Sequence, residues 1–392
     1  MTEQRRVSIL GTRGVPARHG GFETFVARLA PYLAECGWDV SIYCQVEQRG
    51  GGIGEDTWNG CRRWLVPTRA RGTAATIEFD LRSTLHALGH ADLKLVLGYN
   101  TAILNLLHRA RKRRVVMNMD GIEWQRAKWN GFAQRWLRAN EWIGARTAHR
   151  LVADHPEIER HLRRVAPAAH ITMIPYGADE VSESSTDALD TLGLTPEGYV
   201  VMIARIEPEN SVLEVVRAFA RAPLGARLVV LGTFLPEANR YHAVVHQAAS
   251  NECLFPGAIY DPAIVAALRY HALAYVHGHT VGGTNPSLVE ALGAGTPVIA
   301  HDNRFNRWVA GDAAAYFSDE EACRQVLERF VRDPAVRAAG RRASRERHRQ
   351  AFRWQQVREG YETLLRAALG PARDGPARDG PARDDPPRER RG

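Results

Sequence analysis

Long apolar runs and clustered cysteines are both missing from this sequence. No stretch reaches the roughly 18 uninterrupted apolar residues that a membrane-spanning helix requires. The opening MTEQRR leads into a short apolar strand instead of the apolar segment of a signal peptide. The five cysteines stand apart, with no CxxC pair and no histidines at zinc-finger spacing. We therefore predict a cytoplasmic protein of a reducing compartment, without structural metal.

Acidic residues are too few to balance the basic ones. The chain has 52 Lys and Arg against 44 Asp and Glu, a formal net charge of +8, and such an excess attracts phosphate groups. Zinc-finger, RRM and basic-zipper patterns, which would dock a polynucleotide, are absent from the sequence. We therefore expect no nucleic-acid partner, and instead a sugar diphosphate or an anionic lipid surface.

Strands and helices alternate along most of the chain, which at 392 residues and 45% hydrophobic content is long enough for two domains. An apolar strand at 7–10, an apolar-periodic helix at 22–37 and a strand at 39–44 predict a βαβ unit in a parallel sheet. Further strands of a first domain, residues 1–180, are expected at 94–99, 114–120, 150–155 and 171–179.

A second alternating series follows a polar, acidic segment, 181–198, whose composition is typical of a linker. The second domain, 199–369, is expected to end in a helix at 352–369 that packs back on the body. The last residues, 370–392, carry three GPARD repeats and are predicted to be disordered. The strands predicted for the second domain are 199–204, 226–232, 253–259, 273–278 and 297–300. The expected fold class is α/β, with two Rossmann-like, doubly wound parallel-sheet domains facing a central cleft.

The loop GTRGVPARHGG precedes the first helix, which Gly20 and Gly21 open. Glycines at a helix N-terminus leave backbone N–H groups accessible, and the helix dipole favours an anion there. Such loops are also common as plain strand-to-helix turns. We predict a phosphate-binding role for both glycines, with the structural turn as the alternative.

The stretch HGHTVGGTNPSLVEALGAGTPVIAHDN, 277–303, contains a second loop that leads into a helix. Asn285 is a plausible N-cap and Pro286 occupies a favoured first helical position. Glu290 follows one turn later and could accept hydrogen bonds from ribose hydroxyls, or be a solvated helix residue. The donor-binding residues expected from this stretch are Gly283, Thr284, Asn285, Ser287 and Glu290.

Five motifs together resemble a known enzyme family: GGFE, IPYGAD, ARIEPEN, the GGTNPSLVEALGAGTPVIA segment and FRWQQVREGYETLL. Over residues 5–369 the chain resembles the family-four retaining glycosyltransferases of GT-B architecture. GTRGVPARHGGFET together with DGIEW and ARIEPEN is more similar to the bacterial subgroup that contains β-1,4-L-rhamnosyltransferases of capsule and rhamnan synthesis. The resemblance implies a retaining, nucleotide-sugar-dependent hexosyltransferase of cell-surface polysaccharide synthesis.

The resemblance also implies roles for particular residues. Gly20 and Gly21 match the donor-phosphate loop, Arg205 matches the residue that neutralises the leaving diphosphate, and Glu290 matches the glutamate that holds the ribose. The subgroup implies dTDP-L-rhamnose as donor, with a UDP-sugar as the alternative, and a saccharide or lipid-linked saccharide as acceptor. Since no DxD motif stands at a strand end, we expect no metal or other cofactor.

Three positions depart from the family pattern. Gly282 replaces the first glutamate of a paired motif, and Asn210, an expected donor-binding position, replaces a lysine five residues after Arg205. Asp120, in MNMDGIEW, stands where many members have a histidine. A carboxylate there could position the acceptor hydroxyl or stabilise positive charge on the sugar, so Asp120 and Arg205 are the expected catalytic residues. A helix-capping role is the alternative for Asp120.

Residues 124–146 interleave four tryptophans with four arginines and a lysine, and HRARKRR at 108–114 adds a basic cluster. Helical periodicity places Trp129, Phe132, Trp136 and Ile143 on one face, away from the arginines. This pattern predicts either a core-packed helix with a solvated back or reversible docking on an anionic membrane.

Two further classes of function are compatible with the same fold. One is an epimerase or phosphorylase, which would differ by not releasing nucleoside diphosphate in an acceptor-dependent way. The other is a catalytically silent sugar-nucleotide-binding protein, which would bind ligand without turnover.

Overall fold

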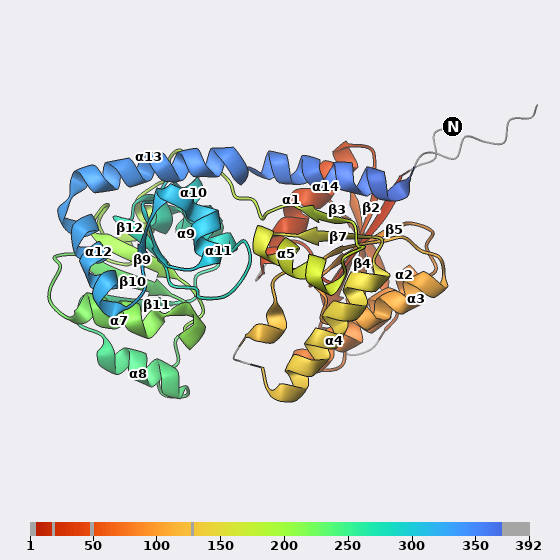
Figure 1. The fold of residues 1–392 in the computed structure, drawn as a ribbon, viewed down its shortest axis with the longest axis horizontal. Coiled ribbons are helices and arrows are strands. Elements are labelled where there is room, and N and C mark those ends of the chain that lie inside the picture. The colour runs from red at the N-terminus through yellow and green to blue at the C-terminus, as the bar shows by residue number, and fades with distance from the viewer. Residues whose placement is uncertain (1–4, 18–19, 48–50, 127–128, 371–392) are drawn as a thin grey trace, which may run out of the picture.

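The computed structural model describes residues 5–17, 20–47, 51–126 and 129–370. Two α/β units, each built on a mainly parallel sheet, form the molecule (Figure 1). This arrangement confirms the predicted fold class. The GPARD repeats lie outside the described residues. In the part of the chain that is described, none of the helices has the length and apolarity needed to cross a membrane.

The first sheet has eight strands in the order β3-β4-β2-β1-β5-β6-β7-β8. All neighbours are parallel except β3 and β4, which form an antiparallel hairpin at one edge. The strands are β1 (Arg6–Leu10), β2 (Asp39–Val46), β3 (Gly54–Trp58), β4 (Cys61–Pro67), β5 (Leu93–Leu97), β6 (Val115–Asn118), β7 (Arg150–Ala153) and β8 (Ile171–Met173). Asn59 and Gly60 close the hairpin with positive φ angles of 46° and 76°. Asn-Gly is the preferred sequence for such a two-residue turn.

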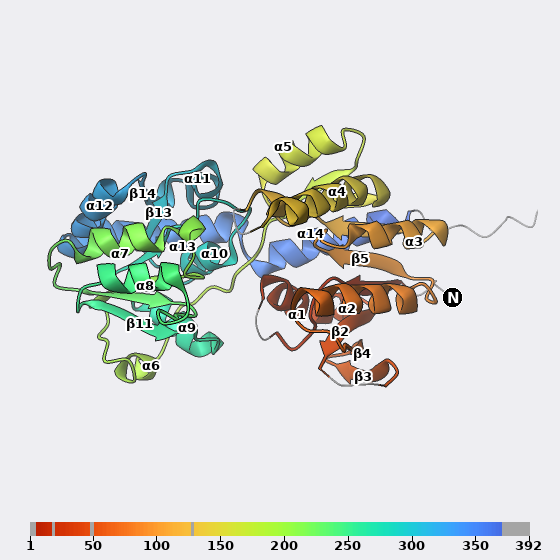
Figure 2. The same cartoon turned by 90° about the horizontal axis from the view of Figure 1, so that it is seen from below.

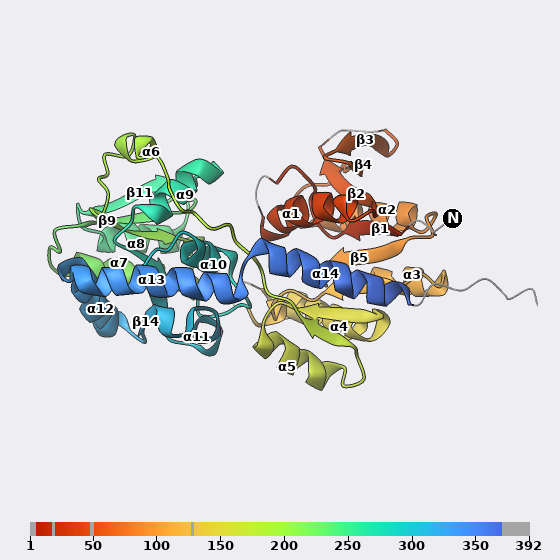
Figure 3. The same cartoon turned by 90° about the horizontal axis from the view of Figure 1, so that it is seen from above.

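Helices cover both faces of this sheet (Figure 2). The first-domain helices are α1 (Gly21–Glu35), α2 (Gly72–Ala87), η1 (Ala102–Leu104), α3 (Asn105–Ala110), η2 (Glu123–Gln125), α4 (Gly131–Thr147) and α5 (Pro156–Val165). One face is covered by α1 together with the C-terminal helix α14 (Trp354–Leu369). Tyr361 of α14 packs on Phe25 with ring centroids 4.7 Å apart and accepts a hydrogen bond from Asn118. The last helix, which was expected to pack back on the body, lies on the first unit, and Figure 3 shows α13 (Pro334–Ala351) and α14 running across both units.

The second sheet has six parallel strands in the order β11-β10-β9-β12-β13-β14. They are β9 (Tyr199–Ile203), β10 (Arg227–Leu231), β11 (Cys253–Gly257), β12 (Ala274–His277), β13 (Val298–His301) and β14 (Ala314–Phe317). The remaining helices are α6 (Asp187–Asp190), η3 (Pro208–Asn210), α7 (Val212–Ala220), α8 (Arg240–Ala248), α9 (Pro262–Tyr270), α10 (Pro286–Gly293), α11 (Arg304–Ala310), η4 (Gly311–Ala313), α12 (Glu320–Arg332) and α13 (Pro334–Ala351). The predicted linker contains α6, and Leu189 and Leu194 bury their side chains in the core of this second unit.

Candidate active site

A cavity of ≈ 750 Å³ lies between the two units. Its walls come from the N-terminus of α1, the N-terminus of α10 and the segments that follow the carboxyl ends of β9, β10 and β11. Ligands of doubly wound sheets bind at these strand ends. Six of the residues expected at the site line this cavity: Gly20, Gly21, Arg205, Asn285, Ser287 and Glu290.

The glycine pair places the start of α1 close to the second unit. Gly20 is the N-cap and Gly21 the first residue of this 15-residue helix. A Cβ atom on Gly21 would lie 3.3 Å from Pro286 Cγ, at the start of α10. Larger residues would therefore push the two helix N-termini apart. Two positive helix ends that face one cavity favour an anionic ligand between them.

Glu290 lies in a network of polar side chains at one wall of the cavity. Its Oε2 atom is 2.6 Å from Nη2 of Arg269, a buried side chain of α9. The same Arg269 nitrogen donates to Ser287 Oγ at 3.1 Å, and Tyr275 donates to Ser287 Oγ at 2.8 Å. These contacts hold the Glu290 carboxylate in one orientation while its side chain stays 34% exposed to the cavity.

Arg205 follows the carboxyl end of β9, and its side chain is 54% exposed. Its guanidinium lies 3.8 Å from Glu207 and 3.6 Å from Glu209. Glu209 is also 3.4 Å from Arg126 of the first unit, so one carboxylate links both arginines across the cleft. These pairs are long enough for a ligand phosphate to compete for Arg205.

Three expected donor-binding residues, Asn210, Gly283 and Thr284, do not line the cavity. Asn210 is 1% exposed, and its amide donates to the backbone oxygen of Arg205 at 2.7 Å, because η3 turns it inward. Thr284 donates its backbone N–H to Asp154 Oδ2 at 3.0 Å instead of leaving it for a diphosphate. A Cβ on Gly283 would overlap the carboxylate of Asp154. Asn210 therefore supports the Arg205 backbone, and the 283–284 loop joins the two units.

Asn285 and Pro286 occupy the positions predicted for them. The Asn285 side chain accepts from Ser287 N at 3.0 Å as the N-cap of α10, and Pro286 is the first helical residue. His155 is the N-cap of α5 and accepts from Glu157 N.

Asp120 follows β6 at the carboxyl edge of the first sheet, with an exposed side chain and φ = 53°. Asn118 Oδ1 accepts from Asp120 N at 2.8 Å and fixes this left-handed turn. Asp and Asn tolerate that conformation better than most residues, and strained residues cluster at functional sites. Asp120 does not line the cavity itself, but the adjoining Gly121 faces Gly282 and Gly283 across the cleft.

Asp154, which the sequence analysis did not single out, lies between Asp120 and the Thr284 loop. Burial, and then the negative charge of Asp120, raise the pKa of Asp154 to about 7. The folded protein thus holds this proton more tightly than the unfolded chain, where the ordinary value is 3.8. The protonated Asp154 carboxyl therefore contributes its full stabilisation of the folded protein below pH 3.8, and this contribution is lost as the pH rises to about 7.

We therefore expect Asp154→Asn to be more stable than the wild type in alkaline solution, by roughly 1–3 kcal/mol at about pH 8. The asparagine oxygen can still accept from Thr284 N without a buried charge. The difference should shrink towards about pH 5, where the wild-type carboxyl is protonated. Denaturant unfolding at both pH values measures it, and an equal difference at the two would contradict the assignment.

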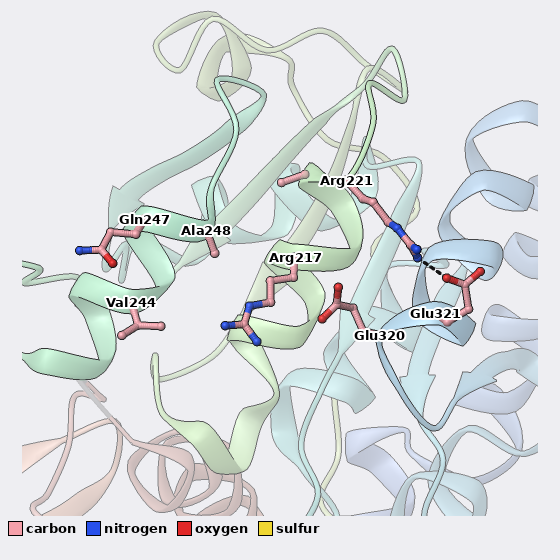
Figure 4. A pocket seen from close by; sticks show the side chains of 8 residues that line it. Arg217, Arg221, Val244, Gln247, Ala248, Glu320 and Glu321 are labelled. Atoms are coloured by element: carbon pink, nitrogen blue, oxygen red, sulfur yellow. Dashed lines mark hydrogen bonds and ion pairs between the residues drawn. The ribbon is translucent and has the colours of Figure 1, made fainter.

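A second hollow, of ≈ 720 Å³, lies on the second unit between α7, α8 and the start of α12 (Figure 4). It contains no strand end and no residue of the first unit. Arg221 and Glu321 point toward each other at its edge as an ion pair. Nothing in this hollow converges on a ligand, and we assign no chemistry to it.

Two family models match consecutive parts of the chain. Residues 4–179 match the family described as Domain of unknown function (DUF1972), and residues 191–347 match the family described as Glycosyl transferases group 1. No curated protein is similar in sequence at a significant level.

Solved structures similar in fold cover nearly the whole chain. Sucrose-phosphate synthase from Thermosynechococcus elongatus is 19% identical, with a TM-score of 0.79 over 93% of this chain and 99% of that one. HepE from Anabaena, in complex with UDP and glucose, is 15% identical, with a TM-score of 0.72 over 93% and 100%. WaaG, a glycosyltransferase involved in lipopolysaccharide biosynthesis, is 16% identical, with a TM-score of 0.71 over 93% and 100%.

The fold is therefore GT-B, with two α/β units on either side of a cavity. Within it, residues 191–347 are the part that matches the glycosyl transferases group 1 family.

Proposed function

We propose that this protein transfers a sugar from a nucleoside diphosphate to a saccharide or lipid-linked saccharide acceptor. The observation that carries this proposal is the cavity in which the glycine start of α1, Arg205 and the Arg269–Glu290 pair converge. The match of residues 191–347 to a glycosyltransferase family supports it.

The cavity offers a suitable place for each part of a sugar nucleotide. Leu231, Ile259 and Val265 form an apolar wall that fits a nucleobase. Glu290, held by Arg269, can accept hydrogen bonds from ribose hydroxyls. The diphosphate would then lie between Arg205 and the N-termini of α1 and α10.

In such a transfer the bond between sugar and phosphate breaks, and negative charge grows on the diphosphate. Arg205 and the oriented N–H groups at Gly20 and Gly21 stabilise that charge without reorganising. These fixed positive groups do what a bridging metal would do, so we propose that the reaction needs none. Asp120, across the cleft, would orient the acceptor hydroxyl or stabilise positive charge on the sugar.

dTDP-L-rhamnose is the donor that we propose first, with retention of the anomeric configuration. The motifs GTRGVPARHGGFET, DGIEW and ARIEPEN support it. A UDP-sugar is the second candidate, favoured by the complex of the similarly folded HepE with UDP and glucose. Thymine and uracil differ by one methyl group, which the apolar wall of Leu231 and Ile259 can accommodate.

Acceptor-dependent release of nucleoside diphosphate tests the proposal. Purified protein is incubated with dTDP-L-rhamnose or a UDP-sugar, with and without a lipid-extract or oligosaccharide acceptor, and the released diphosphate is measured. We expect release only when acceptor is present, and loss of release in Arg205→Ala. Conversion of the donor sugar without release would indicate an epimerase, and binding without turnover would indicate a silent binding protein.

Arg269 provides a separate prediction about donor affinity. We expect Arg269→Met to raise the KM for the donor about tenfold, since Glu290 and Ser287 both lose a partner worth about 1.5–3 kcal/mol in charged hydrogen bonds. The kcat should change less, because Arg269 does not reach the reacting bond. Steady-state kinetics with varied donor measures both values, and Arg269→Lys, which keeps the charge, should recover part of the affinity. A fall in kcat at unchanged KM would contradict this role.

A further inference from the structure

Exposed large apolar side chains are concentrated on one side of the first unit. Among the described residues ten such side chains are exposed, and eight of them lie on α2, η1, α3 and α4. They are Ile77, Leu81, Leu85, Ile103, Leu106, Phe132, Trp136 and Trp142. We call this surface the α2–α4 face. Scattered apolar residues are normal on protein surfaces, but such a concentration marks an interaction site.

The α4 helix does not have the core-packed aromatic stripe that was one alternative in the sequence analysis. Phe132 is 80% exposed and Trp142 54% exposed, while Leu137, Gly144 and Ala145 face the core. The aromatic residues stand on the same side of the helix as Arg135 and are not opposite the arginines. The reason is that small residues pack α4 against the sheet and η1, where Met117 and Ala102 leave little space at Gly144.

Hydrogen bonds join α2, η1 and α4 into one surface. Thr101, before η1, donates to Asp80 of α2 at 2.7 Å. Trp136 of α4 donates to the backbone oxygen of Asn100 at 3.0 Å, and Asn140 of α4 accepts from Ile103 N at 2.9 Å. In Figure 1, α2, α3 and α4 lie on one side of the first sheet and α14 lies on the other.

The fully exposed charges on this face are positive. They are Arg109, Arg135, Arg138 and Arg146, with Arg111 and Lys112 directly after α3. Of the acidic residues on the same helices, Asp80 accepts from Thr101 and Glu141 is 3% exposed. Glu78 is partly exposed, but it accepts from the backbone N–H groups of Arg69 and Ala70 and lies 3.8 Å from Arg82. A second copy of the face would be repelled by the first, whereas a negatively charged surface would be attracted.

We infer that the α2–α4 face docks reversibly on an anionic lipid surface. Aromatic and aliphatic side chains enter the interface between headgroups and acyl chains, and arginines bind the phosphates around them. The short η2 segment connects the Asp120 turn to α4, so docking brings the acceptor side of the cleft towards the lipid. Only the approach of the acceptor side to the lipid rests on the proposed function, in which a lipid-linked acceptor would lie in the membrane. The docking itself does not depend on that function.

Sedimentation with vesicles tests the inference on the full chain. Vesicles of phosphatidylcholine alone are compared with vesicles that also contain phosphatidylglycerol, at low and high salt. We expect binding only to the anionic vesicles, with weakening by salt. The double variants Phe132→Glu/Trp142→Glu and Arg111→Glu/Arg135→Glu should each lower the affinity by about tenfold or more.

Leu235→Glu is the matched control, because Leu235 is 53% exposed but belongs to the second unit. It should bind vesicles like the wild type. Absence of binding to anionic vesicles, or an equal loss in Leu235→Glu, overturns the inference. So does a wild-type dimer in light scattering that Phe132→Glu/Trp142→Glu converts to a monomer, since the face would then join two copies. dTDP or UDP should still raise the melting temperature of every variant. Loss of vesicle binding with this shift retained concerns the α2–α4 face alone, whereas absence of the shift in the wild type concerns the donor site.

Discussion

Arg205→Ala is expected to lower kcat/KM by about 10²–10³-fold. Arg205 is an exposed cation that lines the cavity with the two helix N-termini, so its loss removes a positive partner of the charge that develops on the leaving diphosphate. The fold should be little affected, because Arg205 is 54% exposed, its contacts with Glu207 and Glu209 are 3.8 and 3.6 Å long, and Glu209 keeps Arg126 as a partner. Initial rates with varied donor measure the effect.

Arg221→Ala provides a control of similar exposure. Arg221 is 59% exposed, pairs with Glu321 and lies in the hollow of Figure 4, away from the cavity. Its removal should leave the kinetics unchanged, and Arg205→Lys should keep part of the activity because it keeps the charge. An Arg205→Ala variant with wild-type kcat/KM would show that the diphosphate lies elsewhere.

The second large effect is expected for Asp120→Asn, which should reduce kcat by about 10²–10⁴-fold with little change in donor affinity. Asparagine has the shape of aspartate and tolerates the left-handed turn at φ = 53°, so only the charge and proton acceptor are lost. Because the charge of Asp120 also raises the pKa of Asp154, the variant should titrate Asp154 at a lower pH.

Kinetics and thermal shift on the same preparation separate the outcomes for Asp120→Asn. An unchanged melting temperature, a retained shift with donor nucleotide and a low kcat would support a role at the acceptor side. Unchanged kcat would instead leave Asp120 with a purely structural role, as the residue that turns the chain after β6.

Apolar runs explain why most of the fold was predictable. The buried strand β9 is a continuous apolar segment and β1 and β5 are mainly apolar, while α1 and α14 show helical periodicity. The edge hairpin of β3 and β4 was not predicted, because GEDTW is largely polar and exposed. The Asn59-Gly60 turn was its available signal. The strand β14 was missed as well, since AAYF is short and carries little pattern.

The sequence could predict those residues of the candidate site whose place is set by a local motif, such as the start of a helix. Gly20, Gly21 and Asn285 stand at helix starts, and helix starts at strand ends converge in this class of fold. Arg269 was not found because its partner Glu290 comes from another helix, and Asp154 because its partner Thr284 comes from the other unit. A contact with Asp154 of the other unit also draws Gly283 and Thr284 away from the cavity, whereas Asn210 is held by a local hydrogen bond to the backbone of Arg205.

The measurement that tests the central claim most directly is thermal-shift binding with dTDP, UDP, GDP and dTDP-L-rhamnose. A ligand that binds only the native state raises the melting temperature. The account predicts a selective shift with the thymidine or uridine nucleotides, lost in Arg205→Ala and in Glu290→Ala. No shift with any of these nucleotides, or a shift that both variants retain, would contradict a donor site in the cavity between the two units.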